Sequence, residues 1–236
     1  MASMDVSGCA QYDAITACLN GLDLLDSRAS RSRVLSKPNL VLDLDETLIY
    51  GMAVDSLERH SFYTSHANYL TQFSFSGGVY VILYRPNLFE FLLEISEFFE
   101  LHVYTNSSER YCNEIVRSIS SKLGYNPFKS IKFRTNFSYP YKHLTEIGLS
   151  QSDTVVIDDI IGVWPGDTNN VIEIKKFEGA DDEELVKICE FLMDLHEEHN
   201  KRTHFSEVVF FKNIAHMARD AISDLDMFDA AMSTDQ

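Results

Sequence analysis

Cysteine is scarce in this sequence and never closely paired. The 236 residues include four cysteines, and no two of them form a C-x-x-C pair. Disulfide frameworks and zinc sites usually show closely spaced cysteines, so this pattern predicts free thiols in a reducing compartment. We therefore expect an intracellular protein, nuclear or cytoplasmic. The four residues are Cys9, Cys18, Cys112 and Cys189.

Long apolar runs and an excess of positive charge are also absent. No stretch reaches the roughly 18 apolar residues that a membrane-spanning helix needs. Met1 to Ala10 has neither the basic start nor the apolar core of a signal peptide. Lys and Arg number 20 against 36 Asp and Glu, a formal net charge of −16. Such a field disfavours nucleic acid and anionic membranes, and we expect direct binding to neither.

What is present is an ordinary globular composition, with 45% hydrophobic and 24% charged residues. A chain of this length can form one sizeable core, or a core domain with a small insert. We expect an N-terminal region at 1–36 with an amphipathic helix at about 10–26 and then a linker. A central domain at 37–200 and a helical extension at 201–236 would follow.

The most informative stretch runs from Asn39 to Ile49. Leu40 to Leu42 read as a strand buried on both faces, which is typical of the centre of a parallel sheet. Asp43 and Asp45 follow at a spacing of two, so in extended chain both side chains point to one face. Open α/β sheets bind ligands at this carboxyl edge.

Two carboxylates this close repel each other unless a cation lies between them. Oxygen ligands favour Mg²⁺, which commonly bridges to a phosphate. The alternative is an acidic turn in which Asp43 caps backbone amides. The apolar run before the pair and Glu46-Thr47 after it favour the magnesium site.

The segment Asp43-Leu-Asp-Glu-Thr-Leu48 resembles the nucleophile motif of the haloacid-dehalogenase (HAD) superfamily, in its D-x-D-x-T phosphatase form. Within it, the chain resembles the Fcp/Scp-type protein phosphatases, known for acting on the C-terminal domain of RNA polymerase II. The resemblance runs from about Asn39 to His196. It implies an α/β fold, a HAD-like doubly wound parallel sheet, with Thr47 supporting the site.

A long insertion, about 50–84, follows the first strand. Residues 69–75 and 79–84 alternate as strands, and Gly77-Gly78 between them predicts a β-hairpin. The insertion lies beside the expected active centre and could act as a flap. Its aromatic residues form either a satellite core or a peptide-docking surface. They are Phe62, Tyr63, Tyr69, Phe73, Phe75 and Tyr80.

The helix that follows begins with Arg85-Pro86, and Pro86 suits the first helical position. Leu88, Leu92, Ile95 and Phe99 make its buried stripe. This segment is similar to the family's R-P-x-L-x-x-F-L motif. We expect Arg85 to pair with acids near the site and to organise the structure.

A second predicted strand also ends in polar residues. Thr105 falls at the tip of the strand that begins at Glu100, and Ser107 or Ser108 can cap the following helix, to about Ser121. A plain N-cap without ligand is one interpretation. The resemblance to V-Y-T-x-S instead implies that Thr105 binds phosphate, assisted by the Asn106 amide.

Basic residues are needed to bind a phosphoryl group among aspartates. Lys142 resembles the family's active-site lysine, and Arg134 resembles its substrate-side arginine, although the spacer between them looks shorter than usual. Thr154 to Asp159 is another apolar run that ends in two acids. By resemblance Asp159 is the metal ligand, whereas Asp158 faces Lys142 or loop amides.

One parallel sheet would bring four segments to a single edge: those that carry Asp43 and Asp45, Thr105, Lys142, and Asp158 and Asp159. The resulting constellation predicts two-step phosphoryl transfer through an aspartyl-phosphate. Asp43 is the nucleophile and Asp45 the general acid and base. Mg²⁺, held by Asp43, Asp159 and the Asp45 backbone carbonyl, would offset charge together with Lys142.

The expected function is a Mg-dependent protein serine/threonine phosphatase. No large cap domain follows Thr105, so the site would be open to a phosphoserine peptide, such as polymerase C-terminal-domain repeats. Two alternatives stay open. One is a non-catalytic peptide-binding receptor of the same fold, and the other is a small-molecule HAD phosphatase.

Overall fold

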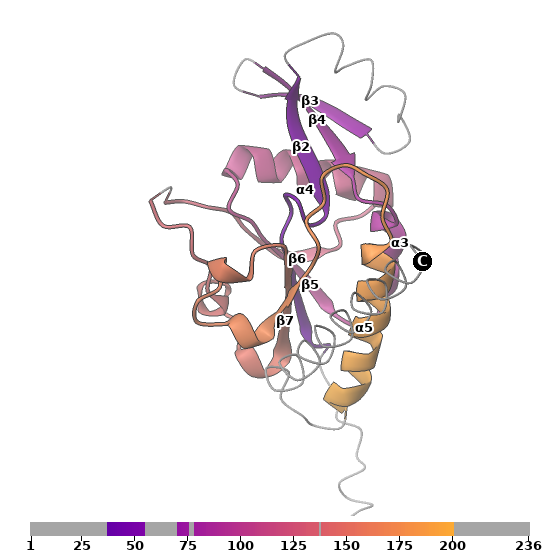
Figure 1. Ribbon diagram of the computed structural model, residues 1–236, viewed down its shortest axis with the longest axis vertical. Coiled ribbons are helices and arrows are strands. Elements are labelled where there is room, and N and C mark those ends of the chain that lie inside the picture. Colours follow the sequence, from indigo (N-terminus) through magenta and orange to yellow (C-terminus); the bar gives the residue numbers. More distant parts are fainter. Residues whose placement is uncertain (1–36, 55–69, 76–77, 137, 201–236) are drawn as a thin grey trace, which may run out of the picture. The chain divides into compact units, whose positions relative to one another are not determined.

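The computed structural model describes residues 37–54, 70–75, 78–136 and 138–200 (Figure 1). The chain divides into two units, Met1–Ser36 and Lys37–Gln236, and the description concerns the second. The expected helix at about 10–26, the linker after it and the extension at 201–236 lie outside the described residues. Those domain boundaries stay predictions.

A five-stranded parallel sheet forms the centre of the domain, with the order β6-β5-β1-β7-β8. The strand that precedes Asp43 is the middle one, and the connections run outward from it in both directions. Such a reversal leaves a crevice at the carboxyl ends of the strands. The strands are β1 (Asn39–Leu42), β5 (Glu100–Tyr104), β6 (Phe128–Lys132), β7 (Thr154–Asp158) and β8 (Val171–Glu173).

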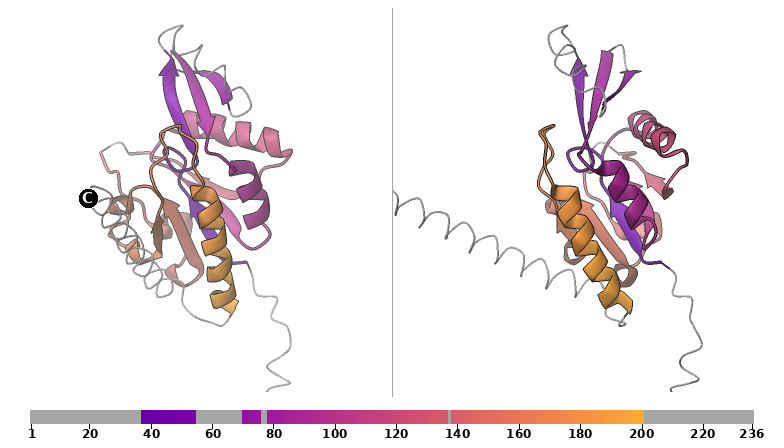
Figure 2. Two further views of the ribbon diagram at one scale, coloured as in Figure 1. Left: turned by 45° about the vertical axis from the view of Figure 1, so that its right-hand side comes forward. Right: turned by 90° about the vertical axis from the view of Figure 1, so that its right-hand side faces the viewer.

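The two faces of β1 belong to different cores, because successive side chains in a strand point to opposite sides. Leu40 and Leu42 pack under helices α3 (Leu88–Ile95), α4 (Glu109–Leu123) and α5 (Glu184–Asn200). Val41 packs on the other face with Leu144 and Trp164. Figure 2 shows α5 lying alongside α3. The predicted α/β class with a parallel central sheet is confirmed.

Short 3-10 helices replace α-helices on the second face. Four lie in the described part of the chain: η2 (Leu144–Ile147), η3 (Gln151–Asp153), η4 (Ile161–Val163) and η5 (Thr168–Asn170). Between Thr105 and β6 the chain contains one helix, α4, and no cap domain. Within the described ranges, the helices are too short or too polar to cross a bilayer.

The insertion forms a three-stranded antiparallel sheet of order β2-β4-β3. The predicted hairpin is confirmed as β3 (Leu70–Phe75) and β4 (Gly78–Tyr84), although 76–77 are outside the described residues. Strand β2 (Ile49–Val54) was not expected, since Tyr50-Gly51-Met52 shows no clear alternation. It pairs along β4 from Ile49–Tyr84 to Val54–Val79. The side chains at 53–78 are not described, so the expectation for most of the insertion's aromatics is untested.

Helix α3 begins later than expected. Asn87 adopts a positive φ of 62°, which breaks the helical path, so Pro86 lies before the helix rather than at its first position. Leu88, Leu92 and Ile95 are buried as expected, whereas Phe99 is buried beyond the helix end. Placing Asn87 in this conformation is a turn property that helical periodicity cannot reveal.

Candidate active site

The carboxyl ends of β1, β5 and β7 meet beside one another, because Leu42 pairs with both Val103 and Ile157. A cavity of about 290 Å³ opens at this edge. Seven of the ten predicted site residues line it: Asp43, Asp45, Thr105, Asn106, Lys142, Asp158 and Asp159. Glu46, Ser107, Ile160 and Val163 complete the lining. Thr47, Arg85 and Arg134 do not reach it.

Lys142 is buried between two carboxylates. Its Nζ donates to Asp43 Oδ1 at 2.6 Å and to Asp158 Oδ2 at 2.7 Å, and the residue is 1% exposed. Burial alone would lower the pKa of Lys142, but the charges of Asp43 and Asp158 outweigh it and raise the pKa. The ammonium is therefore a fixed positive charge at the base of the cavity.

Asp43 follows β1 directly and is 6% exposed. Burial raises the pKa of its carboxyl from the ordinary 3.8 to about 8, with a further contribution from Asp158, although Lys142 opposes the shift. One lysine therefore does not compensate all the acids that meet here. The cavity is electrostatically suited to a further cation.

The two adjacent acids after β7 have different surroundings. Asp158 Oδ2 accepts from Lys142 and from the Trp164 indole N–H at 2.8 Å, while Oδ1 accepts from the Ile160 amide at 2.9 Å. Asp159 is only half-buried, and Oδ1 accepts from the Thr47 hydroxyl at 3.2 Å. The Asp159 amide donates to that same hydroxyl at 3.1 Å, so Thr47 orients Asp159.

Carboxylate oxygens of Asp43, Asp158 and Asp159 all lie within 4.8 Å of one another. An all-oxygen donor set of this kind fits Mg²⁺, which prefers carboxylates and retains several waters. Because Asp158 is already engaged on both oxygens, Asp43 and Asp159 are the better placed ligands. The residues present therefore fit the metal that the sequence predicts.

Asp45 is held by the start of α4. Its Oδ1 accepts from the Tyr111 hydroxyl at 2.7 Å, and its Oδ2 accepts from the Ser107 hydroxyl. Burial raises the pKa of Asp45, and these two hydrogen bonds oppose the rise. Sequence reasoning missed both partners. It gave Ser107 or Ser108 a capping role; Ser108 is the N-cap residue, but its side chain makes no capping hydrogen bond.

Thr105 and Asn106 lie at the end of β5, as expected. Thr105 is 1% exposed, and its hydroxyl accepts from the Ser107 amide at 3.0 Å. The Asn106 side-chain amide donates to the Pro140 carbonyl at 2.8 Å. Phosphate binding by these two residues stays a prediction.

The two arginines are not among the residues that line the cavity. Arg85 is buried, donates to the Thr47 carbonyl at 2.8 Å and pairs with Asp182 at 2.9 Å. It thus braces the loop that carries Thr47. The Arg134 backbone amide donates to the Ser107 carbonyl at 3.0 Å, which brings that residue close to the site without lining it.

The chain is similar to several known proteins. Residues 38–202 match the family model described as NLI interacting factor-like phosphatase. A CTD small phosphatase-like protein 3 of Caenorhabditis elegans is 31% identical, over 77% of this chain and 65% of its own length. An RNA polymerase II C-terminal domain phosphatase-like 4 of Arabidopsis thaliana is 29% identical, over 67% of this chain and 39% of its own length. The chain thus spans less than two thirds of the length of either relative.

Among solved structures, Fcp1, described as an essential RNA polymerase II CTD phosphatase, is similar with a TM-score of 0.53 and 26% identity. The match covers 71% of this chain and 53% of that one. A second structure, of fission yeast Fcp1-R271A bound to beryllium fluoride, has a TM-score of 0.53 at 21% identity. The match covers 88% of this chain and 70% of that one, and at this identity it supports the fold alone.

Proposed function

Because the chain belongs to the NLI interacting factor-like phosphatase family, an Fcp/Scp-type branch of the HAD superfamily, we propose that it is a protein phosphatase. It would hydrolyse phosphoserine and phosphothreonine through an aspartyl-phosphate. The observation that carries the proposal is the buried Asp43, paired with Lys142 at 2.6 Å in a cavity that Asp45 also lines.

In the first step, a carboxylate oxygen of Asp43 attacks phosphorus and the bond from phosphorus to the serine oxygen breaks. Asp45 gives its proton to that oxygen, which leaves as the serine hydroxyl. Burial raises the pKa of Asp45, which favours the protonated form that this step requires. Lys142 offsets the negative charge of the phosphoryl oxygens.

In the second step, Asp45 takes a proton from water, and the water oxygen attacks phosphorus of the aspartyl-phosphate. The acyl-phosphate bond breaks, which releases inorganic phosphate and restores the Asp43 carboxylate. The hydrogen bonds from Tyr111 and Ser107 hold Asp45 in one orientation for both transfers.

Asp43, Asp159 and the Asp45 backbone carbonyl would hold Mg²⁺. When bound, the ion supplies positive charge that stabilises the transferring phosphoryl group. Thr47 would keep Asp159 oriented toward it, and Arg85 would brace Thr47 through its backbone carbonyl.

Metal binding should distinguish the two neighbouring acids. We expect Asp159→Asn to weaken Mg²⁺ binding by about tenfold or more, whereas Asp158→Asn has the smaller effect because its oxygens already serve Lys142, Trp164 and Ile160. Isothermal titration calorimetry measures the Mg²⁺ affinity of both variants. In the parent protein, chelation should stop turnover until Mg²⁺ is restored. A larger loss in Asp158→Asn would reverse the assignment of ligands.

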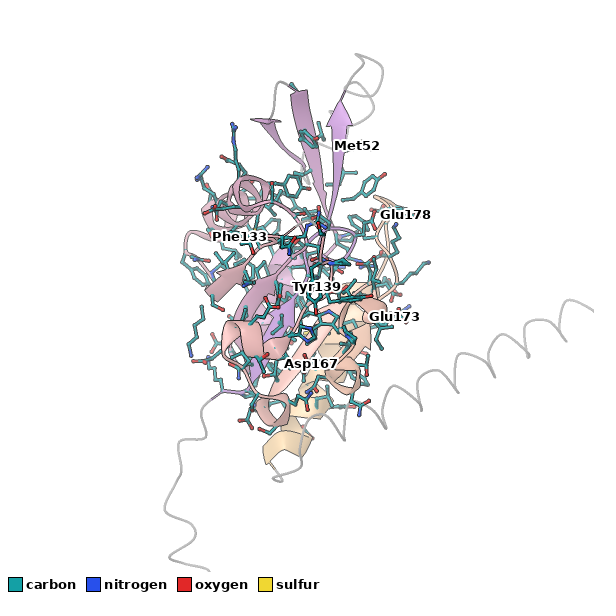
Figure 3. All side chains as sticks on the ribbon, turned by 90° about the vertical axis from the view of Figure 1, so that its left-hand side faces the viewer. Met52, Phe133, Tyr139, Asp167, Glu173 and Glu178 are labelled. Carbon is teal, nitrogen blue, oxygen red and sulfur yellow. The ribbon has the colours of Figure 1, made fainter. Side chains whose placement is uncertain are left out.

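The surface around the cavity favours a peptide over a metabolite. Tyr139, Tyr141 and Ile160 are 46%, 44% and 51% exposed. The Tyr139 and Tyr141 rings meet edge to face, with 5.2 Å between centroids, and Pro140 between them contacts Asn106 of the cavity. Figure 3 shows Tyr139 near the middle of this view, above Asp167.

Exposed aromatic pairs are typical docking surfaces for proline-rich segments. The net charge of −16 disfavours acidic peptides. We therefore propose neutral phosphopeptides rich in Ser, Pro and Tyr as substrates. The polymerase C-terminal-domain repeats, after which several relatives are named, have this character.

A panel of phosphopeptides and phosphometabolites, assayed at equal concentration with Mg²⁺, tests the function. We expect the highest kcat/KM on phosphoserine peptides that contain proline. Better turnover of a sugar or nucleotide phosphate would contradict the proposal, and peptide binding without any turnover would favour a receptor.

The same panel tests the aromatic surface. Tyr139→Ala and Tyr141→Ala should raise KM for these peptides about fivefold or more, as expected for losing an aromatic contact worth about 1 kcal/mol. KM for a small aryl phosphate should stay unchanged. Tyr125→Ala is the matched control, since Tyr125 is 45% exposed but precedes β6, at the opposite edge of the sheet.

A further inference from the structure

The carboxylate of Asp45 accepts hydrogen bonds from two hydroxyl groups, those of Ser107 and Tyr111. Ser107 lies just before the N-cap residue of α4 and Tyr111 lies in the first turn of that helix, and the two side chains donate to different oxygens of Asp45. The Tyr111 hydrogen bond measures 2.7 Å. A carboxylate held on both oxygens cannot rotate freely, so Ser107 and Tyr111 together determine where the Asp45 proton is presented.

The Tyr111 hydroxyl occupies space that only a glycine on β2 leaves open. A Cβ atom on Gly51 would lie 2.1 Å from the Tyr111 oxygen and 3.3 Å from its Cζ. Real Cβ atoms essentially never approach another heavy atom within 3.0 Å. Any side chain at residue 51 and the present Tyr111 hydroxyl therefore exclude one another.

Residue 51 must be glycine because of the space that the Tyr111 hydroxyl occupies, and not because of its backbone conformation. Among the described residues, glycines with positive φ are Gly124, Gly148 and Gly179, and Gly51 is not one of them. Alanine at residue 51 is thus compatible with the strand backbone. Its Cβ would also lie 3.2 Å from Ile82 Cδ1, the end of a flexible side chain, so the 2.1 Å clash with the Tyr111 hydroxyl is the larger effect. The inserted sheet also contacts the Tyr111 ring from β4, where Tyr80 packs edge-on at 6.2 Å.

We propose that Tyr111 and Gly51 are positioning residues for Asp45. The inserted sheet provides the slot in which the phenol sits, and the phenol orients the carboxyl group of the general acid and base. Burial, together with the charge of Asp45, raises the pKa of Tyr111, so its hydroxyl stays a hydrogen-bond donor. This inference rests on the proposed function.

The chemistry supplies a readout that a purely structural role would not affect. A serine alkoxide is a poor leaving group and needs the Asp45 proton, whereas dinitrophenolate leaves without one. Because kcat/KM reports phosphoryl transfer to Asp43, misplacing Asp45 should lower it for phosphoserine peptides and spare it for dinitrophenyl phosphate.

The test uses the full chain with Tyr111→Phe and, separately, Gly51→Ala. Each should lower kcat/KM on a phosphoserine peptide by about tenfold or more, part of the roughly 10²–10⁴ of general acid catalysis, and by less than about threefold on dinitrophenyl phosphate. The double variant should be no worse than either single one, since phenylalanine lacks the oxygen that the alanine Cβ displaces. Gly162→Ala, whose Cβ would meet nothing within 4 Å, is the control.

Two outcomes would overturn the inference. One is an equal loss on both substrates, which indicates general damage to the site. The other is a crystal structure of Gly51→Ala in which the Tyr111 hydroxyl still contacts Asp45. The crystal structure also distinguishes a failure of this inference from a failure of the proposed function. An inactive parent protein would contradict the proposed function, whereas the structure shows by itself whether alanine at residue 51 displaces the Tyr111 hydroxyl from Asp45.

Discussion

Replacing Asp43 with asparagine is expected to lower phosphomonoester hydrolysis by a factor on the order of 10⁴ or more. The amide keeps the volume of the carboxyl group but cannot form an acyl-phosphate. Lys142 retains its hydrogen bond to Asp158 at 2.7 Å, so the site should stay assembled. Hydrolysis of an aryl phosphate with Mg²⁺ measures the loss, and activity within tenfold of the parent would disprove the nucleophile.

The same variant should be at least as stable as the parent without metal. The folded-state pKa of Asp43 is about 8 against an ordinary 3.8, so between these values the folded state binds more protons than the unfolded one. Stability is therefore lost as pH rises through this window, and asparagine removes that dependence. Urea unfolding at pH 5 and pH 8 with a chelator measures it. Asp181→Asn, an exposed acid, is the control.

Replacing Lys142 with methionine should both inactivate and destabilise the protein. The variant leaves the carboxylates of Asp43 and Asp158 buried without their cation. Removing one partner of a buried ion pair typically costs about 3–5 kcal/mol. We expect a loss of this size in the free energy of unfolding, measured by urea at pH 8 with a chelator.

Two further variants decide the cause of that loss. Lys187→Met removes a lysine that is 62% exposed and pairs with Glu184, and it should cost about 0–1 kcal/mol. Adding Asp158→Asn to Lys142→Met should recover part of the stability, since one uncompensated charge disappears. A loss in Lys142→Met no larger than in Lys187→Met would show that the carboxylates do not depend on Lys142.

Most features that depend on neighbouring residues in the sequence were predicted correctly, whereas several features that depend on contacts between distant residues were missed. The runs before Asp43 and Asp158 were recognisable because an apolar strand and its terminal acids are a local pattern. Strand β2 was not, because it forms by pairing with β4 about thirty residues later and carries little alternation of its own. The late start of α3 depends on the single φ of Asn87.

Residue order alone therefore predicted the central strand and the edge to which Asp43, Thr105 and Asp158 belong, and its resemblance to a phosphatase family supplied the chemistry proposed for that edge. Folding decided how those groups are held. Lys142 contacts Asp43 across 99 residues, and Tyr111 contacts Asp45 across 66. Such contacts depend on packing distances of a few ångströms between distant segments. The clearance at Gly51 is of the same kind, because no sequence pattern records the space that a neighbouring element leaves free.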